Sequence, residues 1–101
     1  MKAKLTKYHV GNTERNEVYL WCPGCNGYHS VCVDPGGWIW NGSEEKPTIN
    51  PSIRVSGYRE QYGPGARTLC HSFVKDGKIQ FLNDSAHALA GQTIELPEID
   101  L

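Results

Sequence analysis

The sequence lacks both a long hydrophobic run and an excess of charge of one sign. None of its stretches approaches the roughly 20 apolar residues that cross a bilayer. Residues 1–10 contain Lys2, Lys4 and Lys7 and no apolar segment of a signal peptide. We therefore expect a cytoplasmic protein that does not contact a membrane. In that reducing compartment its cysteines would serve as metal ligands or free thiols rather than form disulfides.

The chain also lacks the basic surplus that nucleic-acid binding requires. Its 10 Lys and Arg residues are balanced by 11 Asp and Glu residues, which gives a formal net charge of −1. Because non-specific binding to nucleic acid depends on neutralising phosphates, we do not expect a nucleic-acid partner. The weakest alternative that we retain is a specific nucleic-acid-binding zinc module that would use Trp38, Tyr58, Arg59 and Arg67.

Turn residues, in contrast, are abundant. The 11 glycines and 6 prolines separate short apolar runs at intervals of about 8 to 12 residues, the spacing of an all-β domain. We predict one zinc-stabilised all-β domain over residues 1–101, built mainly from antiparallel hairpins, with one short helical turn near residues 84–90. The expected strands cover residues 4–10, 17–21, 28–33, 38–41, 53–58, 69–75, 78–82 and 92–96.

The strand register of two hairpins can be predicted from their turn residues. Asp76-Gly77 between apolar runs predicts a type I′ turn that pairs Lys75 with Lys78. The turn residues 34–37 predict a second hairpin between the two strands that flank them. Each hairpin fixes which side chains share a face of the sheet.

Cys22-Pro23-Gly24-Cys25 has the spacing of a zinc knuckle, in which a tight turn aims two thiolates at one ion. Cys70 is the best third ligand, because it lies in the strongest predicted hairpin and would tie two distant parts of the chain together. Cys32 is a weaker candidate, since a lone cysteine among apolar neighbours is usually a small core residue. The sequence therefore predicts one Zn2+ ion bound by Cys22, Cys25, Cys70 and a histidine.

The fourth ligand stays open among three histidines. His87 lies one helical turn beyond Asp84, within reach of Cys70. His71, which ranks level with His87, is adjacent to Cys70, although neighbours on a strand point to opposite faces. His29 follows the knuckle closely and ranks behind these two. The alternatives to a metal site are a redox-active CxxC and an inert thiol pair. A redox-active motif normally precedes a helix, whereas a β-type run follows the motif in this chain.

No catalytic template is present in the sequence. GxSxG, HExxH, GxxxxGK[ST] and GxGxxG are all missing, and so is the H-x-E…P-C-x-x-C signature of zinc deaminases. A Cys70–His71 nucleophile pair is disfavoured because adjacent strand residues diverge. The sequence leaves enzymatic activity open and favours a binding role. The alternative is a small metal-dependent hydrolase with an open zinc site near His29, His71 and His87.

Several motifs occur together between residues 21 and 97. They are Trp21-Cys22-Pro23-Gly24-Cys25 with His29, Trp40-Asn41-Gly42, Pro47-Thr48 through Pro51-Ser52, Cys70-His71-Ser72-Phe73 with Gly77-Lys78-Ile79, and Asp84 through His87-Ala88-Leu89-Ala90-Gly91-Gln92-Thr93. In this combination the chain resembles a family of small proteins of unknown function common in bacteriophage and prophage genomes. Members of that family are sometimes labelled ammonia monooxygenase, a label without physical support here because the sequence has no membrane segment.

The resemblance implies a phage or prophage origin, and it supports a functional set of cysteines and histidines: Cys22, Cys25, Cys70, His29, His71 and His87. It implies no activity. By analogy with small phage accessory proteins, we expect a protein–protein interaction module in the cytoplasm of the bacterial host cell. Its partner would be a host protein from the cell's machinery or defence systems, and the sequence identifies no small-molecule substrate.

Overall fold

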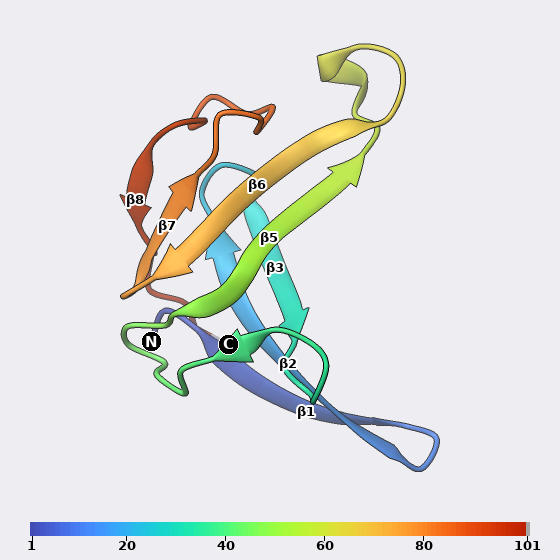
Figure 1. Cartoon of the computed structure of the whole chain (residues 1–101), viewed down its shortest axis with the longest axis vertical. Coiled ribbons are helices and arrows are strands. Elements are labelled where there is room, and N and C mark those ends of the chain that lie inside the picture. Colours follow the sequence, from blue (N-terminus) through green and yellow to red (C-terminus); the bar gives the residue numbers. More distant parts are fainter. Residues whose placement is uncertain (101) are drawn as a thin grey trace.

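The computed structural model describes residues 1–100 and folds as two antiparallel β-sheets (Figure 1). One sheet has the strand order β1-β2-β3 and the other has the order β4-β5-β6-β7-β8. The all-β fold predicted from the turn spacing is therefore confirmed. The strands are β1 (Lys4–Val10), β2 (Thr13–Cys22), β3 (Gly27–Cys32), β4 (Ile39–Trp40), β5 (Ile49–Gly57), β6 (Arg67–Lys75), β7 (Lys78–Phe81) and β8 (Thr93–Glu95).

β1 and β2 form a long hairpin that turns tightly after Val10. Only the second half of β2 enters the core, because Val18, Leu20 and Cys22 alternate with less buried residues and are themselves fully buried. The first residues of β2 are exposed, and they pair with the exposed end of β1. The tip of this hairpin accordingly projects from the body of the molecule as an arm (Figure 1).

β6 and β7 form the hairpin predicted from Asp76-Gly77. The φ angles of these two residues are 50° and 77°, and a type I′ turn requires both to be positive. Lys75 pairs with Lys78 as predicted. The preceding strand β5 runs antiparallel to β6, so that β5, β6 and β7 form the centre of the second sheet.

The predicted pairing of residues 28–33 with residues 38–41 is wrong. β3 pairs with β2 instead, and β4 pairs with β5 in the other sheet. The chain reverses after Cys32 as expected, but it then crosses to the second sheet. There the indole N–H of Trp38 donates to the backbone carbonyl of Ser52 on β5 at 3.3 Å. The turn chemistry specified the reversal but not which sheet would receive the next strand.

The hydrophobic core lies between the two sheets and draws on both. Its buried members include Val18, Leu20 and Val31 from the first sheet and Ile49, Ile53, Val74, Ile79 and Phe81 from the second. Burying one such side chain contributes roughly 1.5–3 kcal/mol. A domain of this size has few of them, so an additional cross-link between the sheets would add substantially to its stability.

The segment after β7 folds as a series of turns rather than as the predicted helical turn over residues 84–90. The Ala90 N–H donates to the His87 carbonyl at 3.3 Å, and the Ala86 N–H donates to the Leu69 carbonyl of β6 at 3.0 Å. A turn of 3-10 helix occurs instead at η1 (Glu60–Tyr62), between β5 and β6. No helix within residues 1–100 is long and apolar enough to cross a membrane.

Candidate functional site

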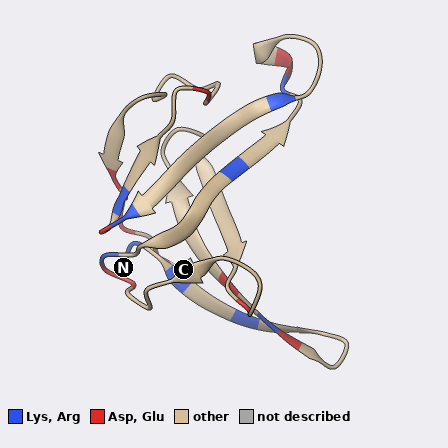
Figure 2. Cartoon of the chain, viewed as in Figure 1, with Lys and Arg blue, Asp and Glu red and all other residues tan. Residues whose placement is uncertain are grey.

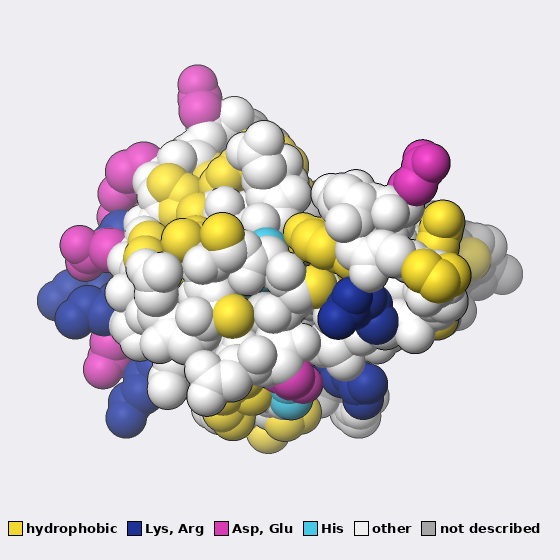
Figure 3. Space-filling model, turned by 90° about the horizontal axis from the view of Figure 1, so that it is seen from above, with side chains coloured by type: hydrophobic (Ala, Val, Ile, Leu, Met, Phe, Trp, Pro, Cys, Tyr) yellow, Lys and Arg dark blue, Asp and Glu magenta, His cyan; other side chains and the backbone are white. Residues whose placement is uncertain are grey.

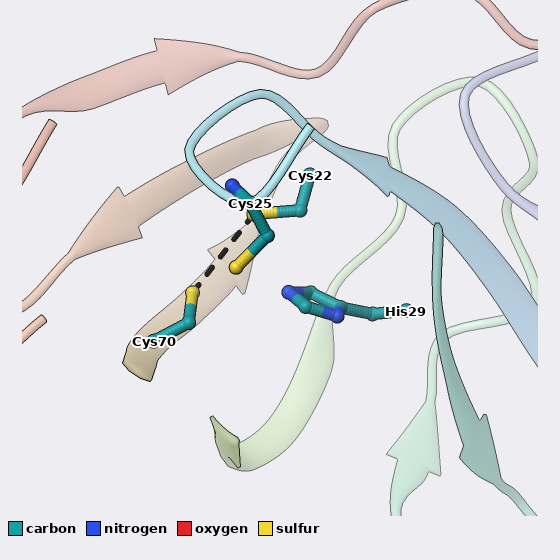
Figure 4. Close-up of side chains that lie close together, drawn as sticks. All are labelled: Cys22, Cys25, His29 and Cys70. Carbon is teal, nitrogen blue, oxygen red and sulfur yellow. Dashed lines mark hydrogen bonds between the residues drawn. The ribbon is translucent and has the colours of Figure 1, made fainter. Parts of the chain in front are cut away.

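Three sulfurs and one imidazole ring converge between the two sheets (Figure 4). Cys22 ends β2, Cys25 lies in the turn that follows, His29 lies on β3 and Cys70 on β6. Their ligand atoms all lie within 4.8 Å of one another. The Sγ atoms of Cys22 and Cys70 are 3.9 Å apart, close to the ~3.8 Å between two sulfurs of a tetrahedral site with Zn–S bonds of about 2.3 Å. This cluster has the donor atoms and the spacing to hold a metal ion.

The turn between Cys22 and Cys25 aims both sulfurs at the cluster. The Cys25 N–H donates to the Cys22 Sγ at 3.4 Å, and such a bond stabilises a thiolate. Asn26 adopts a left-handed backbone conformation with φ of 54°, which asparagine tolerates better than most residues. A side chain at Gly24 would collide with the ring of His87. Glycine at this position therefore lets His87 pack directly against the knuckle.

The members of the cluster strongly influence one another's protonation. Hydrogen bonds from Cys25 and Cys70 hold the pKa of Cys22 far below its usual range, while the contacts with Cys22 and Cys25 raise the pKa of Cys70. Burial lowers the pKa of His29, but the interactions of its ring with the Cys22 and Cys25 sulfurs outweigh burial and raise the pKa to about 9. The cluster therefore favours the thiolate form of Cys22 and the thiol form of Cys70, and a metal ion beside both sulfurs would favour the thiolate form of each.

His29 supplies a second indication that the cluster fits a metal ion. Its Nε2 atom is buried and has no hydrogen-bond partner among the described residues. Buried polar atoms almost always have a partner. A metal ion held by the neighbouring sulfurs would provide one.

The structure brings Cys22, Cys25 and Cys70 together with His29, the histidine that ranked last on the sequence. The β2–β3 pairing explains why, because Leu20 lies opposite His29 and cross-strand neighbours share a face. The mistaken pairing of residues 28–33 concealed this relation. Had β2 and β3 been recognised as a hairpin around the knuckle, His29 would have been the nearest histidine to it.

The other candidate ligands lie at different distances from the cluster. His87 is buried beside it, with Nε2 3.4 Å from the Cys70 Sγ and the ring packed edge-on against Phe81. The Cys32 thiol lies elsewhere and donates to the Asp34 carboxylate at 3.3 Å. His71, although adjacent to Cys70 in sequence, does not belong to the cluster.

On β6, His71 forms a second arrangement of polar side chains. Its Nε2 atom lies 3.0 Å from the Oγ of Ser52 on β5. Its Nδ1 atom lies 3.0 Å and 3.2 Å from the two carboxylate oxygens of Asp84, just beyond the end of β7. The hydrogen bonds run from serine to histidine to aspartate, as in the triad of serine hydrolases.

Asp84 determines which nitrogen of His71 carries the proton. An ionised carboxylate only accepts hydrogen bonds, so Nδ1 is the donor to Asp84. In a neutral imidazole, Nε2 then has a free lone pair and accepts from the Ser52 hydroxyl. The His71 and Asp84 side chains are 24% and 52% exposed, so this site is open to solvent. In this arrangement, His71 Nε2 can take the proton of Ser52 Oγ and return it.

Backbone hydrogen bonds hold His71 and Ser52 in place. The His71 N–H donates to the Ser85 Oγ at 3.0 Å, and the same hydroxyl donates to the His71 carbonyl at 3.1 Å. The Leu82 N–H also donates to that carbonyl, at 2.8 Å. On the other side, Ser52 is held by the bond from Trp38 to its carbonyl. These contacts fix the spacing between the hydroxyl and the imidazole.

β6 connects the two sites through adjacent residues. Side chains alternate along a strand. Cys70 therefore points to the cluster of Cys22, Cys25, His29 and Cys70, called the metal cluster below, while His71 points to Ser52. The segment after β7 contacts both faces, since Asp84 binds His71 and His87 touches Cys70. A displacement of β6 at this point would disturb both sites at once.

A cavity of about 420 Å³ opens beside the metal cluster. Its lining includes Cys25, His29 and His87, together with Arg59 and Tyr62 from the loop after β5. Figure 3 looks down on the molecule from above and shows a small area of histidine surface in a hollow between the larger body and a smaller lobe. Neither Ser52, His71 nor Asp84 lines this cavity, so it adjoins the cysteine and histidine cluster and is separate from the Ser52–His71–Asp84 arrangement.

Comparison with curated proteins and with solved structures finds no match. One family model does match the chain, over residues 2–82. The matched range contains Ser52, His71 and all four residues of the metal cluster, and it ends just before Asp84. The chain thus belongs to the family of bacterial ubiquitination-like system serine proteases, BubE.

Proposed function

We propose that the chain is a serine peptidase in which Ser52 is the nucleophile, His71 is the general base and Asp84 orients His71. The hydrogen bonds that link Ser52 Oγ through both ring nitrogens of His71 to the Asp84 carboxylate carry this proposal. The description of the family as a serine protease of a bacterial ubiquitination-like system supports it. We accordingly propose that the chain acts in such a system.

The reaction follows from the hydrogen bonds of the triad. His71 Nε2 takes the proton of Ser52 Oγ while that oxygen attacks the carbonyl carbon of the scissile peptide bond. When the tetrahedral intermediate collapses, the C–N bond breaks, the same proton passes from Nε2 to the leaving amine, and Ser52 remains as an acyl ester. Water then attacks the ester with His71 again as base, and the proton returns to Ser52 as the carboxylic acid leaves. In both halves Asp84 stabilises the imidazolium through Nδ1–H.

The metal ion, which we propose to be zinc, has a structural role in this reaction scheme. Three thiolates and one imidazole make a closed set of four ligands, typical of structural zinc sites. The ion would join the β2–β3 hairpin to β6, on the face turned away from Ser52. An open zinc site near His29, His71 and His87 is not favoured, because both ring nitrogens of His71 are bonded to Ser52 and Asp84.

The proposed nucleophile can be identified with a small phosphonofluoridate, which reacts covalently with activated serines. We expect one adduct per chain, located on Ser52 by peptide mass spectrometry. His71→Ala should slow the labelling by about 10³-fold or more, because the hydroxyl loses its base. Labelling of another serine, or labelling that persists in His71→Ala, would contradict the assignment of the triad.

The metal assignment predicts a specific coordination shell. In protein purified without a metal-affinity tag, we expect one zinc per chain, and X-ray absorption at the zinc edge should show three sulfur ligands and one nitrogen ligand. His29→Ala should remove the nitrogen, whereas His87→Ala should leave the shell unchanged. Loss of the nitrogen only in His87→Ala would instead make His87 the fourth ligand.

Three expectations from the sequence remain predictions: the cytoplasmic location, the phage or prophage origin, and a host protein as partner. A peptidase that cleaves a protein must first bind it, so the expected interaction role is compatible with the proposed activity. The family description concerns a bacterial system and names neither a phage nor a monooxygenase.

A further inference from the structure

The strand that carries Ser52 is open along one edge. β5 runs from Ile49 to Gly57 and pairs with β6 on one side. On its other side, β4 pairs only with Ile49 and Asn50. Among residues 1–100, therefore, no strand covers that edge of β5 beyond Asn50. At this edge the Trp38 indole N–H donates to the Ser52 carbonyl.

The backbone of Arg54 points to this open edge. Its cross-strand partner is His71, whose N–H and C=O are bonded to Ser85 and Leu82, away from β5. In an antiparallel ladder, such a pair exchanges no hydrogen bonds, and each residue directs its N–H and C=O away from the other. The N–H and C=O of Arg54 therefore face the open edge, where neither has a partner within the described chain.

This edge lies on the side of the nucleophile that is opposite to its base. His71 approaches Ser52 from β6, which borders β5 on the other side. Ser52 and Arg54 are separated by a single residue and so present their side chains on the same face of the sheet. A chain lying along the edge could bring a carbonyl group to Ser52 Oγ without displacing His71.

We propose that the substrate binds as an extended peptide that adds to the open edge of β5, with one of its residues hydrogen-bonded to the N–H and C=O of Arg54. An unpaired strand edge is a template for a further strand. This proposal rests on the proposed peptidase function and defines its substrate class. The cleaved segment is extended and unpaired, as in a flexible chain end or loop, and is not part of a folded sheet or helix.

The side chain of Arg54 suits an edge that is kept free for a substrate. A charged side chain on an open strand discourages pairing with a second copy of the same chain. The Arg54 Nε donates to the Thr68 Oγ1 of β6 at 3.1 Å, which draws the side chain toward β6 and away from the open edge. Arg54 is the only Lys or Arg residue of β5, and Figure 2 shows positive charge on this strand as a blue band.

The test compares Arg54→Pro with Arg54→Ala. Proline removes the N–H that the peptide would use, and a strand edge tolerates it, whereas alanine removes only the side chain. Each variant is treated with a small phosphonofluoridate and with a mixed-sequence pool of N-acetyl tetrapeptide diphenyl phosphonates, and intact mass gives both labelling rates. The ratio of the peptide rate to the small-probe rate should be about tenfold lower in Arg54→Pro than in Arg54→Ala, the effect of one lost hydrogen bond.

A second measurement uses the unmodified chain and does not depend on the folding of the proline variant. Amide hydrogen exchange at Arg54 should slow by about tenfold or more after labelling with the peptide pool, but not after labelling with the small probe. Equal rate ratios in the two variants, unchanged exchange at Arg54, or a pool that fails to label a chain that the small probe labels would each overturn the proposal. A wild-type chain that the small probe cannot label would instead refute the peptidase function itself.

Discussion

Ser52→Ala is expected to abolish peptide hydrolysis, with kcat/KM reduced by about 10⁴-fold or more. The substitution removes the only hydroxyl within hydrogen-bond distance of His71 Nε2 among residues 1–100, so no acyl ester can form. His71→Ala should have an effect of similar size, and the double variant should be no worse than either single one, because the two residues act as a unit. Cleavage of a pool of internally quenched peptides would give the rates.

Ser56→Ala provides a matched control for this experiment. Ser56 lies on the same strand as Ser52, but it is exposed and makes no side-chain hydrogen bond among the described residues. It should therefore keep the wild-type rate. If Ser52→Ala retained most of the activity while its fold was intact, the nucleophile would have to lie elsewhere in the chain.

The parts of the fold that could be predicted from the sequence are those that local residues decide. Asp76-Gly77 fixed the register of β6 and β7, because a type I′ turn admits only one pairing of its flanking strands. Residues 34–37 also encode a reversal, but their chemistry does not specify the sheet that the next strand joins. That choice depends on a tertiary contact, the packing of Trp38 against β5, which no local pattern reveals.

The same distinction between local motifs and tertiary contacts explains which residues of the two sites could be predicted from the sequence. Cys22 and Cys25 lie in one local motif, so both could be proposed as metal ligands directly from the sequence. His29 and Ser52 become candidates only once their strands are paired with β2 and β6. For Ser52 the difficulty is greater, because the β5–β6 register shifts between Ile49 and Ile53, the interval that contains this proposed nucleophile. Bulges of this kind often re-aim a side chain at an active site, and they cannot be counted from the sequence.

Removal of the metal ion is expected to unfold the domain and to inactivate Ser52, although the ion takes no part in the proposed chemistry. Structural zinc contributes on the order of 10 kcal/mol to folding. A domain of this size is stable by only about 5–15 kcal/mol in total, so little stability would remain. A zinc chelator should therefore remove the β-sheet circular dichroism signal and the phosphonofluoridate reactivity together.

The link between metal and triad can be separated from a general effect of the chelator by substituting single cysteines. Cys22→Ser removes a buried proposed ligand and should reproduce the chelated state, with a large fall in Tm and loss of Ser52 labelling. Cys32→Ser is the matched control, since Cys32 lies outside the cluster, and it should change Tm and labelling little. The coupling is expected because Cys70 and His71 are adjacent on β6. The ion would anchor Cys70, and His71 is the proposed base. A chelated chain that kept both its Tm and its labelling rate would show that His71 is held without the metal.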